Sequence, residues 1–137
     1  MLTKEDIILI FLEDPENLAM EIWNENVPKS DEIRTLICEL GNPDCAYWYA
    51  IYIDKGPTDE TRTAGCRDPW RAYCYAMNID KGPTDETRTA ACQDSFRAHI
   101  YALNVDKGPT DETRTAAFRN ENVKDCYKQW ENSLRKI

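Results

Sequence analysis

An eleven-residue block, Asp-Lys-Gly-Pro-Thr-Asp-Glu-Thr-Arg-Thr-Ala, occurs three times without a change in this 137-residue chain. The copies occupy residues 54–64, 80–90 and 106–116, so the sequence repeats with a period of 26. A fixed period of this length is typical of stacked supersecondary units, each of which buries its apolar face against the next. The repeat therefore predicts a solenoid rather than a domain built around one closed core.

The block itself has the signals of a turn between two helices. Gly56 is expected to take the left-handed conformation that closes a helix, and Pro57 cannot continue one. Thr58 can cap a new helix, and the carboxylates of Asp59 and Glu60 suit its positive end. A second start signal, an Asx residue at the N-cap, is found at Asn42, Asp68 and Asp94. Each unit is thus predicted to be a pair of helices.

The units differ along the chain. Residues 41–118 hold three near-identical units, and residues 1–40 hold acidic N-terminal helices with a degenerate repeat that begins at Ser30. Residues 119–137 are predicted to form a closing helix that starts at Asn120. We therefore expect one all-α domain, an α-solenoid of short helix pairs with atypical N- and C-terminal capping helices.

The two helices of a unit differ in polarity. The short helix, residues 58–66 for example, is polar except for a narrow face of small residues. The longer helix, residues 68–79, is apolar around most of its circumference, and only Arg71 and Asn78 are predicted to point outward. Because a helix that is apolar on most faces is usually buried, we expect aromatic long helices inside and acidic short helices outside.

Six cysteines raise the question of disulfides. Cys38, Cys66 and Cys92 hold equivalent places in successive units, and Phe118 holds the fourth. Equivalent places on stacked helices lie roughly 8 to 10 Å apart, which is too far for a disulfide. A position that accepts Cys or Phe behaves as an apolar filler, so we expect free, buried thiols.

Charge is distributed unevenly. The net charge is −8, with ten acids and three bases in residues 1–40 but three acids and five bases in residues 119–137. Opposite ends of this kind permit a head-to-tail homo-oligomer, and the absence of clustered Lys and Arg argues against direct nucleic-acid binding. No apolar run reaches 18 residues, so we expect no membrane span and a soluble, cytoplasmic protein.

One residue pattern of the repeat can be compared with repeats of known proteins. The pattern of Asp, Pro, Ala, Tyr, Ala, Lys and Gly comprises Asp68, Pro69, Ala72, Tyr75, Ala76, Lys81 and Gly82. It resembles a short two-helix repeat of uncharacterised phage and bacterial proteins, over roughly residues 14 to 118. The resemblance implies an α-helical array, a phage origin and a host-cell cytoplasmic location, and it brings no catalytic residues. The layout is also similar to small HEAT-like solenoids, which bind partners.

Two sets of side chains are candidates for partner binding. The first is a ladder of acid pairs, one pair per unit: Asp31, Glu32, Asp59, Glu60, Asp85, Glu86, Asp111 and Glu112. Such carboxylates can face a basic protein surface or imitate a phosphate backbone. Alternatively, they only complement the helix dipole, with an Arg three residues after each Asp to neutralise them.

The second set is aromatic. Most rings of the long helices are expected to pack between successive helices. Trp48 and Tyr52 are exceptions, because residue 52 aligns with Asn78 and Asn104 and should point outward. A groove of such rings can hold a peptide, whereas stacking of bases would need a positive channel.

Catalysis has no support in the sequence. His99 is the only histidine and aligns with Tyr47 and Tyr73, so we interpret it as a packed ring. The chain has no Cys-x-x-Cys pair, no His-rich spacing and no glycine-rich phosphate loop. We therefore expect no enzyme activity, no metal and no cofactor.

Two functional hypotheses remain. The preferred one is a protein-binding module that presents an acidic surface to a basic protein, such as a phage-encoded inhibitor of a host nucleic-acid-processing or defence complex, of the anti-CRISPR or DNA-mimic type. The alternative is a structural repeat protein that assembles head to tail.

Overall fold

The computed structural model describes residues 1–135, and all of the regular structure in this part of the chain is helical. The α-helices are α1 (Lys4–Glu13), α2 (Pro15–Trp23), α3 (Asp31–Glu39), α4 (Pro43–Tyr49), α5 (Asp59–Gly65), α6 (Pro69–Tyr75), α7 (Asp85–Ala91), α8 (Ser95–Tyr101), α9 (Asp111–Ala117) and α10 (Glu121–Leu134). Three π-helical turns extend α4, α6 and α8: η1 (Ala50–Asp54), η2 (Ala76–Asp80) and η3 (Ala102–Asp106). The predicted α-solenoid is confirmed.

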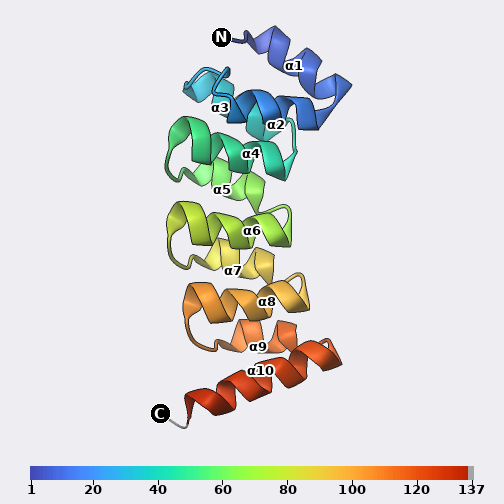
Figure 1. Ribbon diagram of the computed structural model, residues 1–137, viewed down its shortest axis with the longest axis vertical. Helices are drawn as coiled ribbons and strands as arrows, with labels where there is room; N and C mark the ends of the chain where they lie inside the picture. The colour runs from blue at the N-terminus through green and yellow to red at the C-terminus, as the bar shows by residue number, and fades with distance from the viewer. Residues whose placement is uncertain (136–137) are drawn as a thin grey trace.

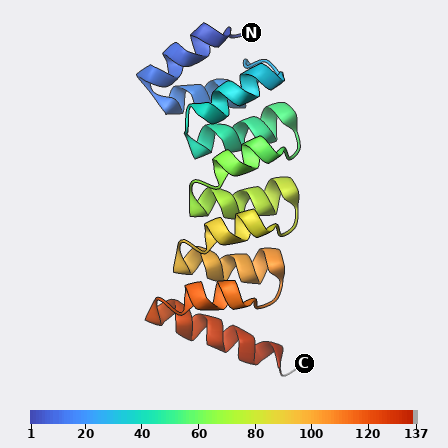
Figure 2. The same cartoon turned by 180° about the vertical axis from the view of Figure 1, so that it is seen from behind.

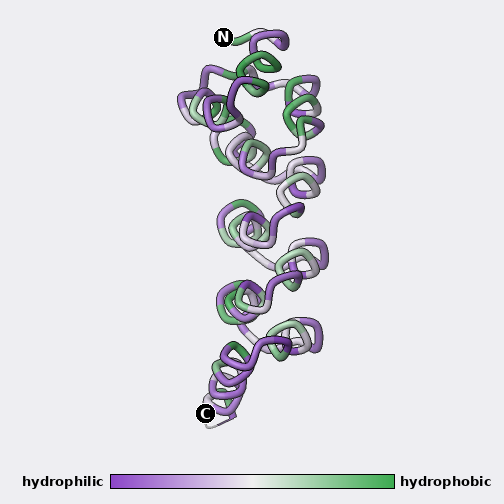
Figure 3. The backbone as a smooth tube through the Cα atoms, turned by 90° about the vertical axis from the view of Figure 1, so that its right-hand side faces the viewer, coloured by the Kyte–Doolittle hydropathy of each residue, from purple (hydrophilic) through white to green (hydrophobic). Residues whose placement is uncertain are grey.

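The helices form two layers that run the length of the molecule. In Figure 1 the long helices α4, α6 and α8 lie in front and the short helices α5, α7 and α9 lie behind them; Figure 2 shows the short-helix layer from its own side. Seen along the helix axes, the chain makes two columns of helices (Figure 3). Each short helix contacts the long helices before and after it in the chain. The molecule therefore has two broad faces, a long-helix face and a short-helix face.

The predicted helix starts are confirmed. Thr3 and Asp6 form a capping box at the start of α1, and the Thr58 hydroxyl accepts a hydrogen bond from the amide of Thr61 at the start of α5. Asp68 caps α6 by accepting from the amide of Arg71. These bonds satisfy amides that have no partner within the helix, so each unit sets its own boundaries locally.

The core lies between the two layers and repeats with the sequence. Tyr75 is fully buried together with Ala72 and Ala76, and Ile79 completes the stripe. The equivalent tyrosines of the other units are fully buried as well: Tyr49, Tyr101 and Tyr127. Small alanines next to each ring let the neighbouring helix backbones approach closely, so one large residue per unit fills the space between layers.

The prediction that the long helices lie inside the molecule is wrong in one respect, because one side of each long helix faces water. Trp70 is 42% exposed, Phe96 is 50% exposed and Met77 is 38% exposed. In a two-layer array each helix touches neighbours on three sides and water on the fourth, and the breadth of the apolar arc did not reveal this outer face. The long-helix face is consequently aromatic and solvent-exposed.

The prediction that Gly56 takes the left-handed conformation is also wrong. Lys55, Lys81 and Lys107 take it, with φ of 56°, 57° and 57°. Each π turn ends at the Asp before this lysine, so the lysine is the left-handed C-cap and the chain reverses one residue before the glycine. The Gly56 amide then donates to the carbonyl of Ala50, six residues back, which closes the helix end.

The cysteines are free thiols, as expected. Cys38 and Cys92 are buried, whereas Cys66 is half-buried. Within residues 1–135 no helix combines the length and the apolar character that crossing a bilayer requires.

Candidate partner-binding surfaces

A buried tyrosine holds each short helix in place. The Tyr75 hydroxyl lies 2.8 Å from the Thr61 hydroxyl and accepts from the amide of Thr58 at 3.1 Å. Tyr101 makes the same contacts with Thr84 and Thr87 in the next unit. Since these hydroxyls lie at the first turn of α5 and α7, the tyrosines fix the helix ends that carry the acid pairs.

An arginine forms a second clamp between the helices of each unit. The Arg62 guanidinium donates to both carboxylate oxygens of Asp80, at 2.9 and 2.6 Å, and Asp80 is nearly buried. The same guanidinium donates to Asp59 at 2.8 Å. The Asp80 hydrogen bonds, with a smaller contribution from Asp59, raise the pKa of Arg62. Arg34 and Arg88 repeat this arrangement in their own units.

This geometry revises the predicted neutralisation of the acid ladder. The Arg three residues after Asp31, Asp59 and Asp85 does bind that Asp, at 2.6, 2.8 and 3.0 Å. However, the same Arg pairs more extensively with the buried Asp of the following π turn. One positive charge is therefore shared between two carboxylates, and the exposed end of each unit remains negative.

The glutamates of the ladder connect one unit to the previous one. The Thr63 hydroxyl donates to Glu86 at 2.9 Å and the Thr89 hydroxyl donates to Glu112 at 2.9 Å. Thr35 makes the same contact with Glu60, and Lys4 pairs with Glu32. These bonds explain part of the ladder structurally, because the Thr–Glu bonds tie neighbouring short helices together and the Lys4–Glu32 pair ties α1 to α3.

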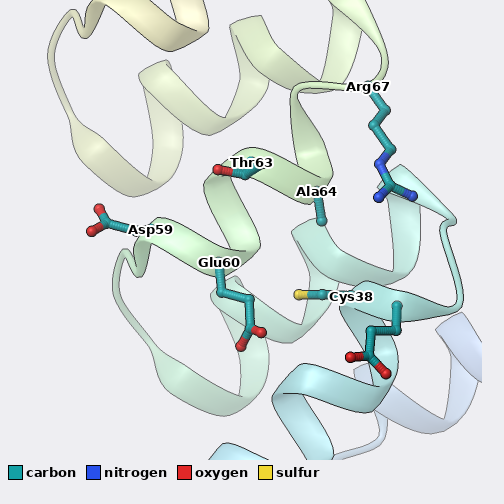
Figure 4. Close-up of a pocket in the computed structure, with 7 residues that line it drawn as sticks. Cys38, Asp59, Glu60, Thr63, Ala64 and Arg67 are labelled. Carbon is teal, nitrogen blue, oxygen red and sulfur yellow. The ribbon is translucent and has the colours of Figure 1, made fainter.

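Between the short helices lie three shallow grooves, which we call the acidic grooves. Their volumes are about 350, 610 and 390 Å³. The first is lined by Cys38, Glu39, Asp59, Glu60, Thr63, Ala64 and Arg67. Figure 4 shows the Cys38 thiol facing Ala64 at its centre, Arg67 at one end, and the Asp59 carboxylate pointing away into solvent. The other two grooves are lined by the equivalent residues of later units, including Asp85 and Glu86, then Asp111 and Glu112.

The ladder predicted from the sequence is thus brought onto one face. The side chains of Asp31, Asp59 and Asp85 are fully exposed and recur once per unit. Asp111 and Glu112 continue the row at the third groove. An evenly spaced row of accessible carboxylates can accept hydrogen bonds and ion pairs from a partner that presents cations at a matching step.

The thiols in the grooves lack the low pKa of a reactive cysteine. Burial raises the pKa of Cys38, Cys66 and Cys92 to about 12 in each case, with the nearby glutamates as a second cause. A thiol with such a pKa is protonated at neutral pH and is neither a nucleophile nor a ready metal ligand. Within the described residues no three His, Cys, Asp or Glu side chains gather in a way that could hold a metal ion.

His99 packs among aromatic rings, as its alignment with Tyr47 and Tyr73 predicts. Its ring centroid lies 5.5 Å from that of Tyr127 and 6.0 Å from that of Trp130. Burial lowers the pKa of His99, so the imidazole is neutral at pH 7, and its Nδ1 has no hydrogen-bond partner among the described residues.

The second predicted pair, Trp48 and Tyr52, lies on the opposite, long-helix face. The two rings stack with centroids 5.6 Å apart and an angle of 25° between them. Both are half-buried rather than fully outward, because α2 lies against them. With Ala19, Met20 and Trp23 of α2 they line a cavity of about 240 Å³, which we call the aromatic pocket.

Sequence reasoning missed Met20 and Trp23 as members of this pocket. Leu18 and Ile22 are fully buried, whereas Trp23 is 55% exposed and Met20 is 50% exposed. Apolar residues cover a wider arc of α2 than one buried stripe requires. This additional apolar surface was the sequence signal that could have identified Met20 and Trp23.

Comparison of the chain with protein-family models, with curated proteins and with solved structures finds no match. The resemblance to short phage and bacterial two-helix repeats therefore stays a prediction, and the function has to be argued from these two surfaces.

Proposed function

We propose that this protein is a non-catalytic binding module whose short-helix face takes an extended, basic segment of a protein partner. The observation that carries the proposal is the row of fully exposed Asp carboxylates that recurs once per unit beside the acidic grooves. A cationic side chain of the partner would lie at each groove and pair with the Asp and Glu at its edge.

The repeat step favours an extended peptide. Stacked helices lie roughly 8 to 10 Å apart. A chain extended in the polyproline II conformation rises about 3.1 Å per residue and has three residues per turn. Three residues of such a chain therefore span about one unit and return the side chain to the same face. A segment with Lys or Arg at every third position would place one cation at each of the three grooves.

A phage-encoded inhibitor of a host nucleic-acid-processing or defence complex is a narrower form of this proposal. The acidic face would occupy the basic surface of such a complex. The step between the acid pairs of successive units is longer than the roughly 3.4 Å rise per phosphate along one DNA strand. Binding of a basic peptide segment thus agrees with the geometry better than the DNA-mimic version, in which the acids would closely imitate a phosphate backbone.

The test uses two synthetic peptides of equal length and composition. One carries five lysines at every third position among serines, and the other carries the same lysines in one block. We expect the periodic peptide to bind several-fold more tightly in fluorescence anisotropy, and binding of both to weaken as salt rises. Equal affinity for the two peptides, or affinity that ignores salt, would contradict the proposal.

A matched pair of variants locates the binding face. The triple variant Asp59→Asn, Asp85→Asn, Asp111→Asn removes three exposed charges and leaves the buried Arg–Asp pairs intact, so the fold should remain. The control, Glu5→Gln, Glu13→Gln, Glu121→Gln, removes three exposed acids elsewhere. We expect loss of periodic-peptide binding only in the first variant. Equal loss in both variants would mean that net charge, and not this face, accounts for binding.

Head-to-tail assembly is the second candidate. On α1, Leu9 is 67% exposed and Leu12 is 72% exposed, which gives the acidic N-terminal part of the chain an apolar surface as well. Contact between this surface and the basic C-terminal part of another copy would bury both residues. Light scattering at low salt decides this alternative, since a monomer at high concentration would remove it.

A further inference from the structure

We propose that the aromatic pocket between α2 and α4 binds the methylated ammonium group of a partner's modified lysine. Three rings converge on it: Tyr52 stacks on Trp48, and the Trp23 ring lies 6.5 Å from Tyr52 at an angle of 53°. Clusters of Trp and Tyr whose rings line the walls of a pocket bind quaternary ammonium groups through the negative faces of the rings. This surface is separate from the acidic grooves, and the inference does not depend on them.

The protein itself places cations over the rings of this face. The Arg71 guanidinium lies 4.7 Å from the Tyr47 ring centroid and 5.2 Å from that of Trp48. One unit further on, the Arg97 guanidinium lies 5.1 Å from the Trp70 ring and 5.3 Å from the Phe96 ring. Each of these four rings therefore already has a cation from its own chain.

Two of the rings of the aromatic pocket differ in this respect. Within residues 1–135 no Lys or Arg is placed over Trp23 or Tyr52, so no cation of the chain itself occupies these two rings. Trp23 is also among the most exposed large apolar side chains of the long-helix face. A partner's cation would complete there the arrangement that Arg71 and Arg97 make internally.

The charges around the pocket favour a cation over a neutral group. Glu16 lies on the same face of α2 as Met20 and Trp23 by helical spacing, and it is exposed without an ion pair among the described residues. The neighbouring Arg71 is balanced by Asp44, 2.6 Å away. The surrounding residues 1–40 carry ten acids against three bases. The pocket thus lies in the most acidic part of the chain.

The size of the cavity limits the occupant to a side chain. About 240 Å³ is below the roughly 300 to 1,000 Å³ of pockets that enclose a whole small molecule. Its lining is almost wholly apolar, and it offers few hydrogen-bond acceptors to an unmodified ammonium, which is strongly hydrated. Methylation removes the N–H groups that need such acceptors and keeps the charge, so methylated lysine fits the lining best.

The test is a titration with Nα-acetyl-Nε-trimethyl-lysine amide, followed through the indole N–H signals of the four tryptophans by NMR. We expect saturable shifts of Trp23 and Trp48, with Trp70 and Trp130 unchanged. A neutral analogue, in which carbon replaces the quaternary nitrogen, should bind about tenfold more weakly, a difference within the range of desolvated cation–π contacts. Trp23→Ala should abolish saturation, and Glu16→Gln should weaken binding several-fold.

Trp70→Ala is the matched control, since it removes an exposed tryptophan of the same face and should leave the titration unchanged. Equal binding of the neutral analogue would assign the pocket to an apolar side chain and overturn the proposal. Shifts that follow protein concentration rather than ligand would assign it to a second copy of the chain. Absence of saturation up to roughly 50 mM ligand, far above a millimolar Kd, would also overturn it. The triple Asp→Asn variant of the short-helix face should bind normally, which separates this result from the peptide test.

Discussion

At the scale of single residues, hydroxyl groups in the core decide how each unit closes. Tyr75 is fully buried and brings its hydroxyl to the first turn of α5, where it meets Thr61 and the backbone of Thr58. A buried hydroxyl without a partner is costly, whereas a satisfied pair contributes modestly. The ring therefore fills the core, and its hydroxyl fixes which short-helix end it lies against.

A double-mutant cycle tests this role. Tyr75→Phe leaves the Thr58 amide and the Thr61 hydroxyl short of a partner, and we expect it to lower the free energy of unfolding by about 1 to 2 kcal/mol. Thr61→Val should cost a similar amount. The double variant should cost about 1 kcal/mol less than the sum, because it removes both members of the buried pair. Urea unfolding followed by circular dichroism measures each value, and strict additivity would show that the contact contributes nothing.

The Arg–Asp clamps show what sequence could and could not reveal at this scale. The three-residue spacing of Asp59 and Arg62 predicts their ion pair, which the structure contains. The stronger bidentate partner, Asp80, lies eighteen residues away and belongs to the next helix. Such a pairing depends on the angle between two helices, which no local pattern states. The exposure of the acid ladder was predictable, whereas the sharing of each Arg was not.

At the scale of helices and turns, starts were predictable and ends were not. The N-caps follow from side chains that bond their own neighbouring amides, as with Thr58 and Asp68. The π turn η2 instead depends on packing, since it carries Ile79 in the core and Asp80 beside Arg62. The same distinction applies to the aromatic pocket, where the contribution of Trp23 became visible only once α2 lay beside α4.

The left-handed lysines give a prediction about these turns. Lys81 and Lys107 hold a conformation that costs an ordinary residue about 1 kcal/mol or more and costs glycine little. Glycine also loses more conformational entropy on folding, which offsets part of the relieved strain. The double variant Lys81→Gly, Lys107→Gly should therefore be more stable by roughly 0.5 to 1 kcal/mol in the free energy of unfolding. Thermal and urea unfolding measure the gain.

The control for this prediction is the double variant Lys81→Ala, Lys107→Ala. It removes the same side chains and keeps the strained backbone, so it should show no comparable gain. A Cβ added at the following glycine, Gly82, would meet no atom within 4 Å, and φ is not positive there. Gly82→Ala should therefore be tolerated. If alanine at residues 81 and 107 stabilised the protein as much as glycine, backbone strain would not be the cause.

At the scale of the whole molecule, the units contact mainly their neighbours. α5 contacts α4 and α6, and α7 contacts α6 and α8, so within residues 1–135 no central core holds distant units together. The stability of such an array is approximately the sum of unit and interface contributions. The acidic grooves share this property, because each is made by two adjacent short helices. Binding strength on that face should therefore depend on the number of units.

This independence predicts that one whole unit can be removed. Deletion of residues 80–105 joins Ile79 to Asp106, and the eleven-residue block that follows is identical to the one removed. Tyr73 then takes the place of His99, which the alignment of the units makes equivalent. We expect a folded, cooperatively unfolding protein of lower stability, with one acidic groove fewer and weaker binding of the periodic lysine peptide.

Deletion of residues 93–105 is the control. It removes a single long helix and its turn and places two short helices in succession, so the product should not fold. Circular dichroism and size-exclusion chromatography separate the outcomes: if the 26-residue deletion unfolded as completely as the 13-residue one, contacts beyond neighbouring units would hold the array together.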